Sequence, residues 1–172
     1  MSTVLYFAYG SNMLVQRLRE RTPSAQVIGR ATLRGHELAW HKRGQDGSGK
    51  CDLVRSADPD AQAQGVLYAL DGAERPLLDK AEGLGHGYDA AQLTVQTLDG
   101  MAHRALMYVA TDIDARLAPY DWYKALVLAG AIQHGLPAKV LRAMDAVASH
   151  ADPDALRAEH HWRLVQSGLD LF

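Results

Sequence analysis

The chain begins with a short strand that leads through a glycine into a helix. Residues 4–9 (VLYFAY) form an uninterrupted apolar and aromatic run, which is typical of a buried strand and ends at Gly10. Ser11 and Asn12 then provide side chains that commonly cap a helix, and the apolar spacing over residues 13–21 predicts a short helix. The first unit is therefore predicted to be strand, turn and helix.

Short strands dominate the middle of the chain. Apolar or alternating runs, most of them separated by glycine or aspartate, predict strands at residues 26–32, 36–41, 51–55, 64–70, 88–98 and 103–109. One helical segment interrupts them at residues 74–81, with Pro76 in its first turn and Gly83 beyond its end. Because so few helical crossovers separate the strands, the pattern favours a curved sheet or a small barrel over alternating strands and helices.

The periodicity becomes helical after Pro119. Helices are predicted at residues 121–134, closed by Gly135, at residues 137–149, opened by Pro137, and at residues 153–166, capped by Asp152 and ended by Gly168. No repeat or long linker separates this helical part, about residues 119–168, from the strands. We therefore expect one α+β domain over residues 1–172.

Composition and charge argue against several classes of protein. The 172 residues are 48% apolar with a formal net charge of −2, so the chain can build a core and has no overall positive field to attract nucleic acid or an anionic membrane. Residues 1–16 lack Lys, Arg, Asp and Glu, but polar residues interrupt them, which indicates neither a membrane span nor a signal peptide. The single cysteine, Cys51, excludes an internal disulfide and favours a cytoplasmic protein.

Three motifs resemble ligand sites but have a simpler interpretation. Residues 44–51 nearly match a phosphate-binding loop, yet a cysteine replaces the hydroxyl residue and a strand follows, which favours a hairpin or substrate-side loop. His36 and His41 would point to opposite faces of a strand and cannot converge on a metal ion. The neighbours His160 and His161 point to different sides of a helix and are expected at the surface. We expect no metal site.

Two local features can carry chemistry. The turn at Gly10 lets the backbone approach a ligand closely, and N–H groups at the start of the following helix can hold a carboxylate or an oxyanion. Glu82 lies where the middle helix ends, and there the helix dipole opposes ionisation of a carboxylate, which suits a general base. Each feature alone also fits a structural turn or a solvent-exposed glutamate.

Several short motifs follow one another in a distinctive order. They are YFAYGSN at residues 6–12, GVLY at residues 65–68, LDKAEG at residues 78–83 followed by GY at residues 87–88, YK at residues 123–124, GA at residues 130–131 and HGLP at residues 134–137. In this order they resemble the γ-glutamylcyclotransferase-like, or AIG2-like, superfamily. The resemblance implies an α+β fold in which a small mixed β-barrel of about six or seven strands is flanked by helices.

The resemblance also implies a set of site residues. Glu82 falls on the family's catalytic general acid and base. The substrate-binding residues that it implies are Tyr9, Gly10, Ser11, Asn12, Tyr88 and Tyr123. It implies neither a cofactor nor a metal ion, and the partner is a small-molecule γ-glutamyl substrate.

The reaction implied by the resemblance releases a γ-glutamyl group as 5-oxoproline. The substrate's α-amine attacks its own γ-carbonyl, while the catalytic carboxyl group removes a proton from the amine and then protonates the leaving nitrogen. The resemblance thus implies a cyclotransferase that acts on a γ-glutamyl amino acid or peptide. Two alternatives stay open: a γ-glutamylamine cyclotransferase, and a non-catalytic protein of the same fold that binds a small molecule.

Overall fold

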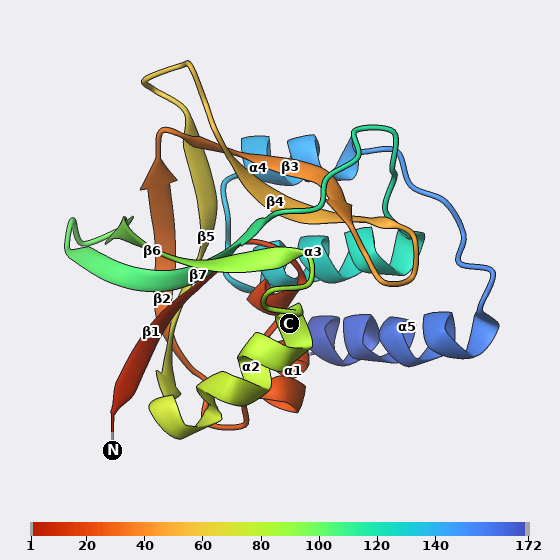
Figure 1. Cartoon of the computed structure of the whole chain (residues 1–172), viewed down its shortest axis with the longest axis horizontal. Helices are drawn as coiled ribbons and strands as arrows, with labels where there is room; N and C mark the ends of the chain where they lie inside the picture. Colours follow the sequence, from red (N-terminus) through yellow and green to blue (C-terminus); the bar gives the residue numbers. More distant parts are fainter. Residues whose placement is uncertain (1, 171–172) are drawn as a thin grey trace.

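The computed structural model describes residues 2–170, in which five strands form a closed barrel (Figure 1). Around the barrel they follow the order β1 (Thr3–Ala8), β5 (Gln62–Asp71), β2 (Gln26–Arg34), β6 (Tyr88–Thr97) and β7 (Ala102–Ala110). Neighbouring strands are antiparallel except β1 and β7, which are parallel and close the barrel. The expected mixed β-barrel of an α+β fold is confirmed.

The number of strands in the barrel differs from the expected six or seven. Strands β3 (His36–Arg43) and β4 (Gly49–Arg55) pair with each other in a separate two-stranded sheet. Both edges of β2 are already occupied, by β5 and β6, and the chain turns away after β2 at Gly35, whose φ of +69° is left-handed. All seven predicted strands are therefore present, but two of them lie outside the barrel.

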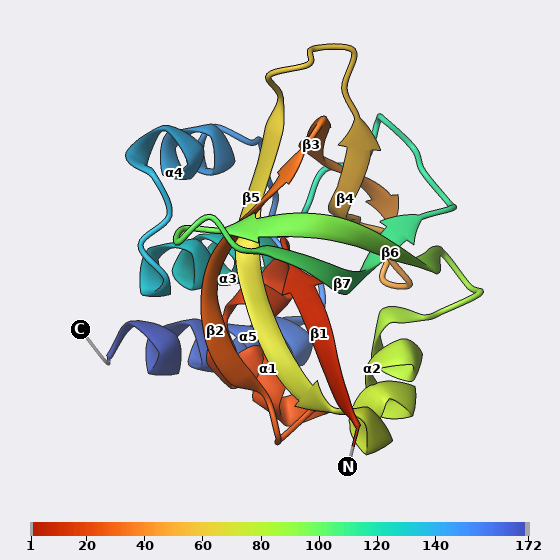
Figure 2. The ribbon, with the colours of Figure 1, turned by 90° about the vertical axis from the view of Figure 1, so that its left-hand side faces the viewer.

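Helices flank the barrel, as predicted (Figures 1 and 2). They are α1 (Val15–Arg21), α2 (Arg75–Glu82), α3 (Asp121–Gln133), α4 (Ala138–Asp145) and α5 (Ala155–Leu169), with 3₁₀ turns at Ser11–Met13 and Gly72–Glu74. Helices α3 and α5 pack against each other beside the barrel. Over residues 2–170, none of the helices combines the length and the apolar character that crossing a membrane requires.

The start of the first helix differs from the prediction. Ser11 and Asn12 do not cap α1, because they form a separate 3₁₀ turn, and the helix begins only after Leu14 without a side-chain cap. Both polar side chains are buried instead, where Ser11 accepts a hydrogen bond from Arg17 and Asn12 donates one to Glu82. Contacts with other side chains therefore replace local capping.

The last helix also begins and ends differently. Asp154, and not Asp152, caps α5 by accepting a hydrogen bond of 3.0 Å from the backbone N–H of Arg157. Asp152 binds the guanidinium of Arg157 instead. Gly168 does not end the helix but lies inside it, because a Cβ there would be 2.5 Å from the side chain of Leu14, so the glycine lets α5 approach that residue.

Gly130 lets α3 press onto the segment that follows β1. A Cβ at Gly130 would lie 2.5 Å from the backbone nitrogen of Leu14 and 2.7 Å from the carbonyl carbon of Met13. These are main-chain atoms of a close-packed interior and cannot move aside at little cost. The contact therefore fixes the 3₁₀ turn that carries Ser11 and Asn12.

We expect Gly130→Ala to destabilise the protein by about 1–3 kcal/mol, because the added methyl group overpacks this contact. Urea denaturation followed by circular dichroism measures the free energy of unfolding. Ile132→Ala, at a residue of the same helix that is 46% exposed, is the control and should change this free energy by under about 1 kcal/mol. A Gly130→Ala protein as stable as the parent would contradict the close contact.

Candidate active site

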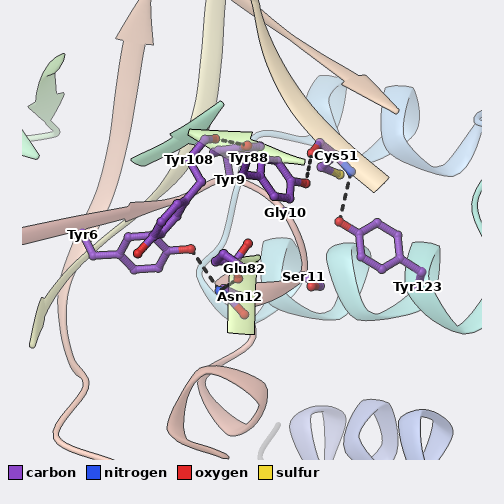
Figure 3. A pocket seen from close by; sticks show the side chains of 10 residues that line it. All are labelled: Tyr6, Tyr9, Gly10, Ser11, Asn12, Cys51, Glu82, Tyr88, Tyr108 and Tyr123. Atoms are coloured by element: carbon purple, nitrogen blue, oxygen red, sulfur yellow. Dashed lines mark hydrogen bonds between the residues drawn. The ribbon is translucent and has the colours of Figure 1, made fainter. Parts of the chain in front are cut away.

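The aromatic end of β1 leads into a small cavity of about 30 Å³ (Figure 3). Its walls are formed by Tyr6, Tyr9, Gly10, Ser11, Asn12, Cys51, Glu82, Tyr88, Tyr108 and Tyr123. The structure thus brings together all seven site residues predicted from the sequence, although they come from four separate stretches of the chain. It adds two tyrosines of the barrel, Tyr6 and Tyr108, and the cysteine of β4.

Glu82 is the last residue of α2 and projects into this cavity. Gly83 follows it in a left-handed conformation, with φ of +73°, which ends the helix at the cavity wall. The Glu82 side chain is 14% exposed, and its Oε1 accepts hydrogen bonds from Asn12 Nδ2 at 2.8 Å and Arg21 Nη1 at 2.6 Å. Within residues 2–170 no donor is bonded to Oε2, so one oxygen is anchored and the other is available to a ligand.

Arg21 and Tyr6 complete the polar network around Glu82, and the sequence analysis identified neither. Arg21 Nη1 also donates to Asn12 Oδ1 at 3.0 Å, and Asn12 Nδ2 lies 3.0 Å from the Tyr6 hydroxyl. Burial raises the pKa of Tyr6, and the nearby charge of Glu82 raises it further. Arg21 carries no local sequence signal, because its contact with Glu82 joins residues 61 positions apart. Tyr6 is the first residue of the YFAYGSN motif, so the motif could have indicated that it belongs to the site.

Two predicted tyrosines hold the backbone of Cys51 on opposite sides. The Tyr88 hydroxyl donates to the Cys51 carbonyl at 2.6 Å, and the Cys51 N–H donates to the Tyr123 hydroxyl at 3.0 Å (Figure 3). Burial raises the pKa of Tyr9, Tyr88 and Tyr123 well above the ordinary value for tyrosine. Burial also raises the pKa of the Cys51 thiol to about 12, which keeps it protonated and unsuited to act as a nucleophile near neutral pH.

Gly10 allows the β1 end to approach β4. A Cβ at Gly10 would lie 3.0 Å from Cys51 Cβ and 3.3 Å from the Tyr123 hydroxyl. The sequence predicts that this glycine lets the backbone approach a ligand, and within the described chain the close approach that it allows is to Cys51. Its φ of −115° is not left-handed, and the short distances to Cys51 and Tyr123 show that this position needs space.

A larger cleft of about 540 Å³ adjoins the cavity and shares Ser11, Glu82, Tyr88 and Tyr123 with it. Positively charged side chains predominate in its lining, which includes Arg17, Arg21, Lys42, Lys50 and Arg157 beside Glu20, Asp46 and Glu82. Glu82 therefore lies where a small tyrosine-lined cavity meets a wide cationic cleft. A ligand with two chemically different ends fits this arrangement.

Residues 44–48 form the tip of the β3–β4 hairpin and residues 49–51 begin β4, and Gly44, Asp46 and Lys50 of this segment line the cleft. Strand β4 stands where a nucleotide-binding loop would lead into a helix, so the predicted hairpin interpretation is confirmed. Asp46 accepts hydrogen bonds from Ser48, and the Lys50 ammonium lies 2.7 Å from Asp46 Oδ2. Burial lowers the pKa of Lys50 to about 8, although the hydrogen bond and charge of Asp46 oppose this shift.

The histidines do not form a metal centre. His41 lies 2.8 Å from Asp52, and no group of three or more His, Cys, Asp or Glu side chains over residues 2–170 is arranged to hold an ion. His160 is exposed, as predicted, whereas His161 is half-buried and lines the cleft. Its ring stacks on Trp122 at 3.9 Å between centroids and lies 3.2 Å from Arg17, because α5 packs beside the cleft.

Comparison with known proteins supports a single family. The AIG2-like family model matches residues 62–144, a range that includes Glu82, Tyr88 and Tyr123. The gamma-glutamylcyclotransferase of Bos taurus is 29% identical over 155 residues, which cover 83% of this chain and 78% of the relative, and that of Mus musculus is 29% identical over 157 residues, covering 84% and 79%. A solved structure described as a gamma-glutamyl cyclotransferase superimposes with a TM-score of 0.87 at 26% identity, covering 96% of this chain and 99% of that chain.

We expect Lys50 to lose its proton at about pH 8, well below the value of roughly 10.4 for a lysine in a peptide. NMR titration of labelled lysine side chains measures this, and the signal that disappears in Lys50→Arg identifies the residue. Asp46→Asn should lower the pKa further, because it removes the charge that favours the ammonium. A higher pKa in Asp46→Asn than in the parent would contradict the ion pair.

Proposed function

Because the chain belongs to the γ-glutamylcyclotransferase-like, or AIG2-like, superfamily, we propose that it releases 5-oxoproline from a γ-glutamyl amino acid or peptide. One observation carries this proposal. Glu82 is partly buried between the tyrosine-lined cavity and the cationic cleft, with one oxygen anchored by Asn12 and Arg21 and the other available to a substrate. A single positioned carboxyl group is what an intramolecular cyclisation requires.

In the proposed reaction, the glutamyl part of the substrate lies beside Glu82 at the mouth of the tyrosine-lined cavity, and the leaving group extends into the cleft. The α-amine attacks the γ-carbonyl carbon, which forms the C–N bond of the five-membered ring and breaks the amide bond to the leaving nitrogen. Glu82 takes a proton from the amine and returns it to that nitrogen, so the carboxylate is regenerated. Because the attacking amine and the carbonyl group belong to the same substrate molecule, the protein does not need to supply a nucleophile of its own. This agrees with a Cys51 thiol that burial keeps protonated.

We assign substrate positioning to the segment from Tyr9 to Asn12 and to Tyr88 and Tyr123. The first N–H groups of a helical turn have no partner within the turn, so those near Ser11 can donate to the substrate's carboxylate or to the carbonyl oxygen. The tyrosine rings form the walls that separate the reacting atoms from bulk water. Arg17 supports this segment, because its Nε donates to the Ser11 hydroxyl at 2.9 Å.

The proposal extends to the organisation and location of the protein. We treat the barrel and the helical part as one domain, because α3 packs on the 3₁₀ turn that carries two site residues. We place the protein in the cytoplasm, since its one cysteine is a buried free thiol and a reducing compartment suits it. The proposed substrate is a small molecule, in agreement with a cleft of about 540 Å³ beside Glu82.

Replacing Glu82 by Gln tests the assigned acid and base. We expect Glu82→Gln to lower kcat by roughly 10²- to 10⁴-fold, because an amide cannot shuttle the proton. Chromatographic detection of 5-oxoproline released from γ-glutamylalanine measures this rate. Glu20→Gln, which alters another carboxylate of the cleft, is the matched control and should retain turnover. Turnover of Glu82→Gln within a few fold of the parent would refute the role of Glu82.

Replacing Tyr123 by Phe tests the cavity wall. We expect Tyr123→Phe to lower kcat/KM by roughly tenfold, because the change removes a buried polar group and leaves the Cys51 N–H without its acceptor. The same product assay measures this. Tyr120→Phe removes a hydroxyl that donates to the Asp46 carbonyl outside the cavity, and it should have little effect. Equal kcat/KM values for Tyr123→Phe and Tyr120→Phe would limit Tyr123 to a packing role.

A further inference from the structure

The cationic cleft contains two largely buried cationic side chains that form no salt bridge within residues 2–170. Three of its five cations are paired, Arg21 with Glu82, Lys50 with Asp46 and Arg157 with Asp152. Arg17 and Lys42 line the same cleft but make no salt bridge to any carboxylate over residues 2–170. Arg17 is 8% exposed and Lys42 is 5% exposed. Their stems are therefore largely buried, and since every buried side-chain nitrogen over residues 2–170 has a hydrogen-bond partner, the unbonded Lys42 ammonium is open to the cleft without a carboxylate partner.

Lys42 is held so that its ammonium reaches the part of the cleft next to Glu82. The backbone of Lys42 is fixed in β3, where it pairs with Lys50 and forms a bridge to Ile113. Its Nζ lies 4.5 Å from the centre of the Tyr88 ring, and a Cβ at Gly87 would lie 3.0 Å from that Nζ. The absence of a side chain at Gly87 therefore makes room for the ammonium.

None of the carboxylates that face Lys42 within residues 2–170 forms a salt bridge with it. Burial lowers the pKa of Lys42, and the carboxylates of Glu82, Asp112 and Asp46 act in the opposite direction without forming a salt bridge to it. Glu82 is bonded to Arg21, and Asp46 is bonded to Lys50. The carboxylates nearest to Lys42 in the cleft thus already have cationic partners.

Arg17 presents part of its guanidinium to the cleft in a fixed orientation. Its Nε donates to the Ser11 hydroxyl at 2.9 Å, and its Nη1 lies 3.2 Å from Nδ1 of His161. Burial lowers the pKa of His161 to about 3, so this ring is neutral near pH 7 and supplies no charge. Among residues 2–170 no acceptor is bonded to Nη2, which leaves donors for a ligand. Guanidinium donors of this kind match a carboxylate.

We propose that this cleft is an anion site in which Lys42 and Arg17 each bind a carboxylate of the leaving group. It selects γ-glutamyl substrates whose leaving group is an acidic amino acid, with two carboxylates, over neutral or cationic leaving groups. The inference rests on the proposed function, because the cleft meets the cavity at Glu82, where the leaving nitrogen receives its proton. A simple alkylamine supplies no negative charge to either cation, and a lysine joined through its side chain supplies only one carboxylate.

Two substrates of nearly equal size test the selection. γ-Glutamylglutamate and γ-glutamylglutamine differ by one carboxylate, and the parent protein should turn over the first with a kcat/KM roughly tenfold higher or more. Lys42→Met keeps the apolar stem but removes the charge, so the preference should fall to within about threefold, and Lys42→Arg should restore much of it. Lys139→Met, an exposed lysine on α4, is the control and should keep the full preference.

Binding of inert analogues separates this inference from the proposed function. N-glutarylglutamate and N-glutarylglutamine lack the attacking amine, and calorimetry on the parent and on Lys42→Met measures their dissociation constants. Tighter binding of the acidic analogue by the parent, lost in Lys42→Met, supports the anion site even if no substrate yields 5-oxoproline. Equal binding of both analogues, a preference unchanged in Lys42→Met, or faster turnover of γ-glutamylpropylamine than of γ-glutamylglutamate would overturn it.

Discussion

The ion pair between Arg21 and Glu82 fixes the geometry on which the site depends. It joins the ends of α1 and α2, two helices that four strands separate along the chain, and Asn12 bonds to both side chains. A partly buried pair of this kind adds little net stability, because desolvation offsets much of the attraction. Losing either partner leaves a charge without compensation, so the pair acts mainly by holding one oxygen of Glu82 in a single position.

Close backbone contacts position the remaining parts of the site. Gly130 brings α3 against the main chain of Met13 and Leu14, and Gly10 brings the end of β1 against Cys51. Because neither glycine has a side chain, the neighbouring segments touch each other directly at these two positions. The 3₁₀ turn between them therefore has little freedom to move. Sites carried by rigid elements hold reacting groups more accurately than sites on free loops. The barrel therefore serves as the frame against which the turn and the end of α2 are fixed.

The sequence predicted the elements better than the contacts between them. Strand and helix periodicity and the stop at Gly83 are local properties, and each was confirmed with small shifts at the ends. Ser11 and Asn12 lie in the cavity wall beside the other predicted site residues, but they do not cap the helix as predicted, because their side chains bond to Arg17 and Glu82 inside the fold. Arg21 and His161 were missed, since their contacts with the site join distant segments and leave no pattern in nearby residues.

The distribution of protons in the cavity limits how a cyclisation could proceed there. Burial raises the pKa of the tyrosine hydroxyls and of the Cys51 thiol, so these groups are protonated near neutral pH. Glu82 is the one carboxyl group among the residues that line the cavity. Attack and departure take place at the same carbonyl carbon, so both nitrogens must come within reach of the same carboxyl group. Glu82 lines both the cavity and the cleft. One oxygen at this boundary could therefore serve both nitrogens of a substrate that bends there, with its glutamyl chain towards the cavity and its leaving group towards the cleft.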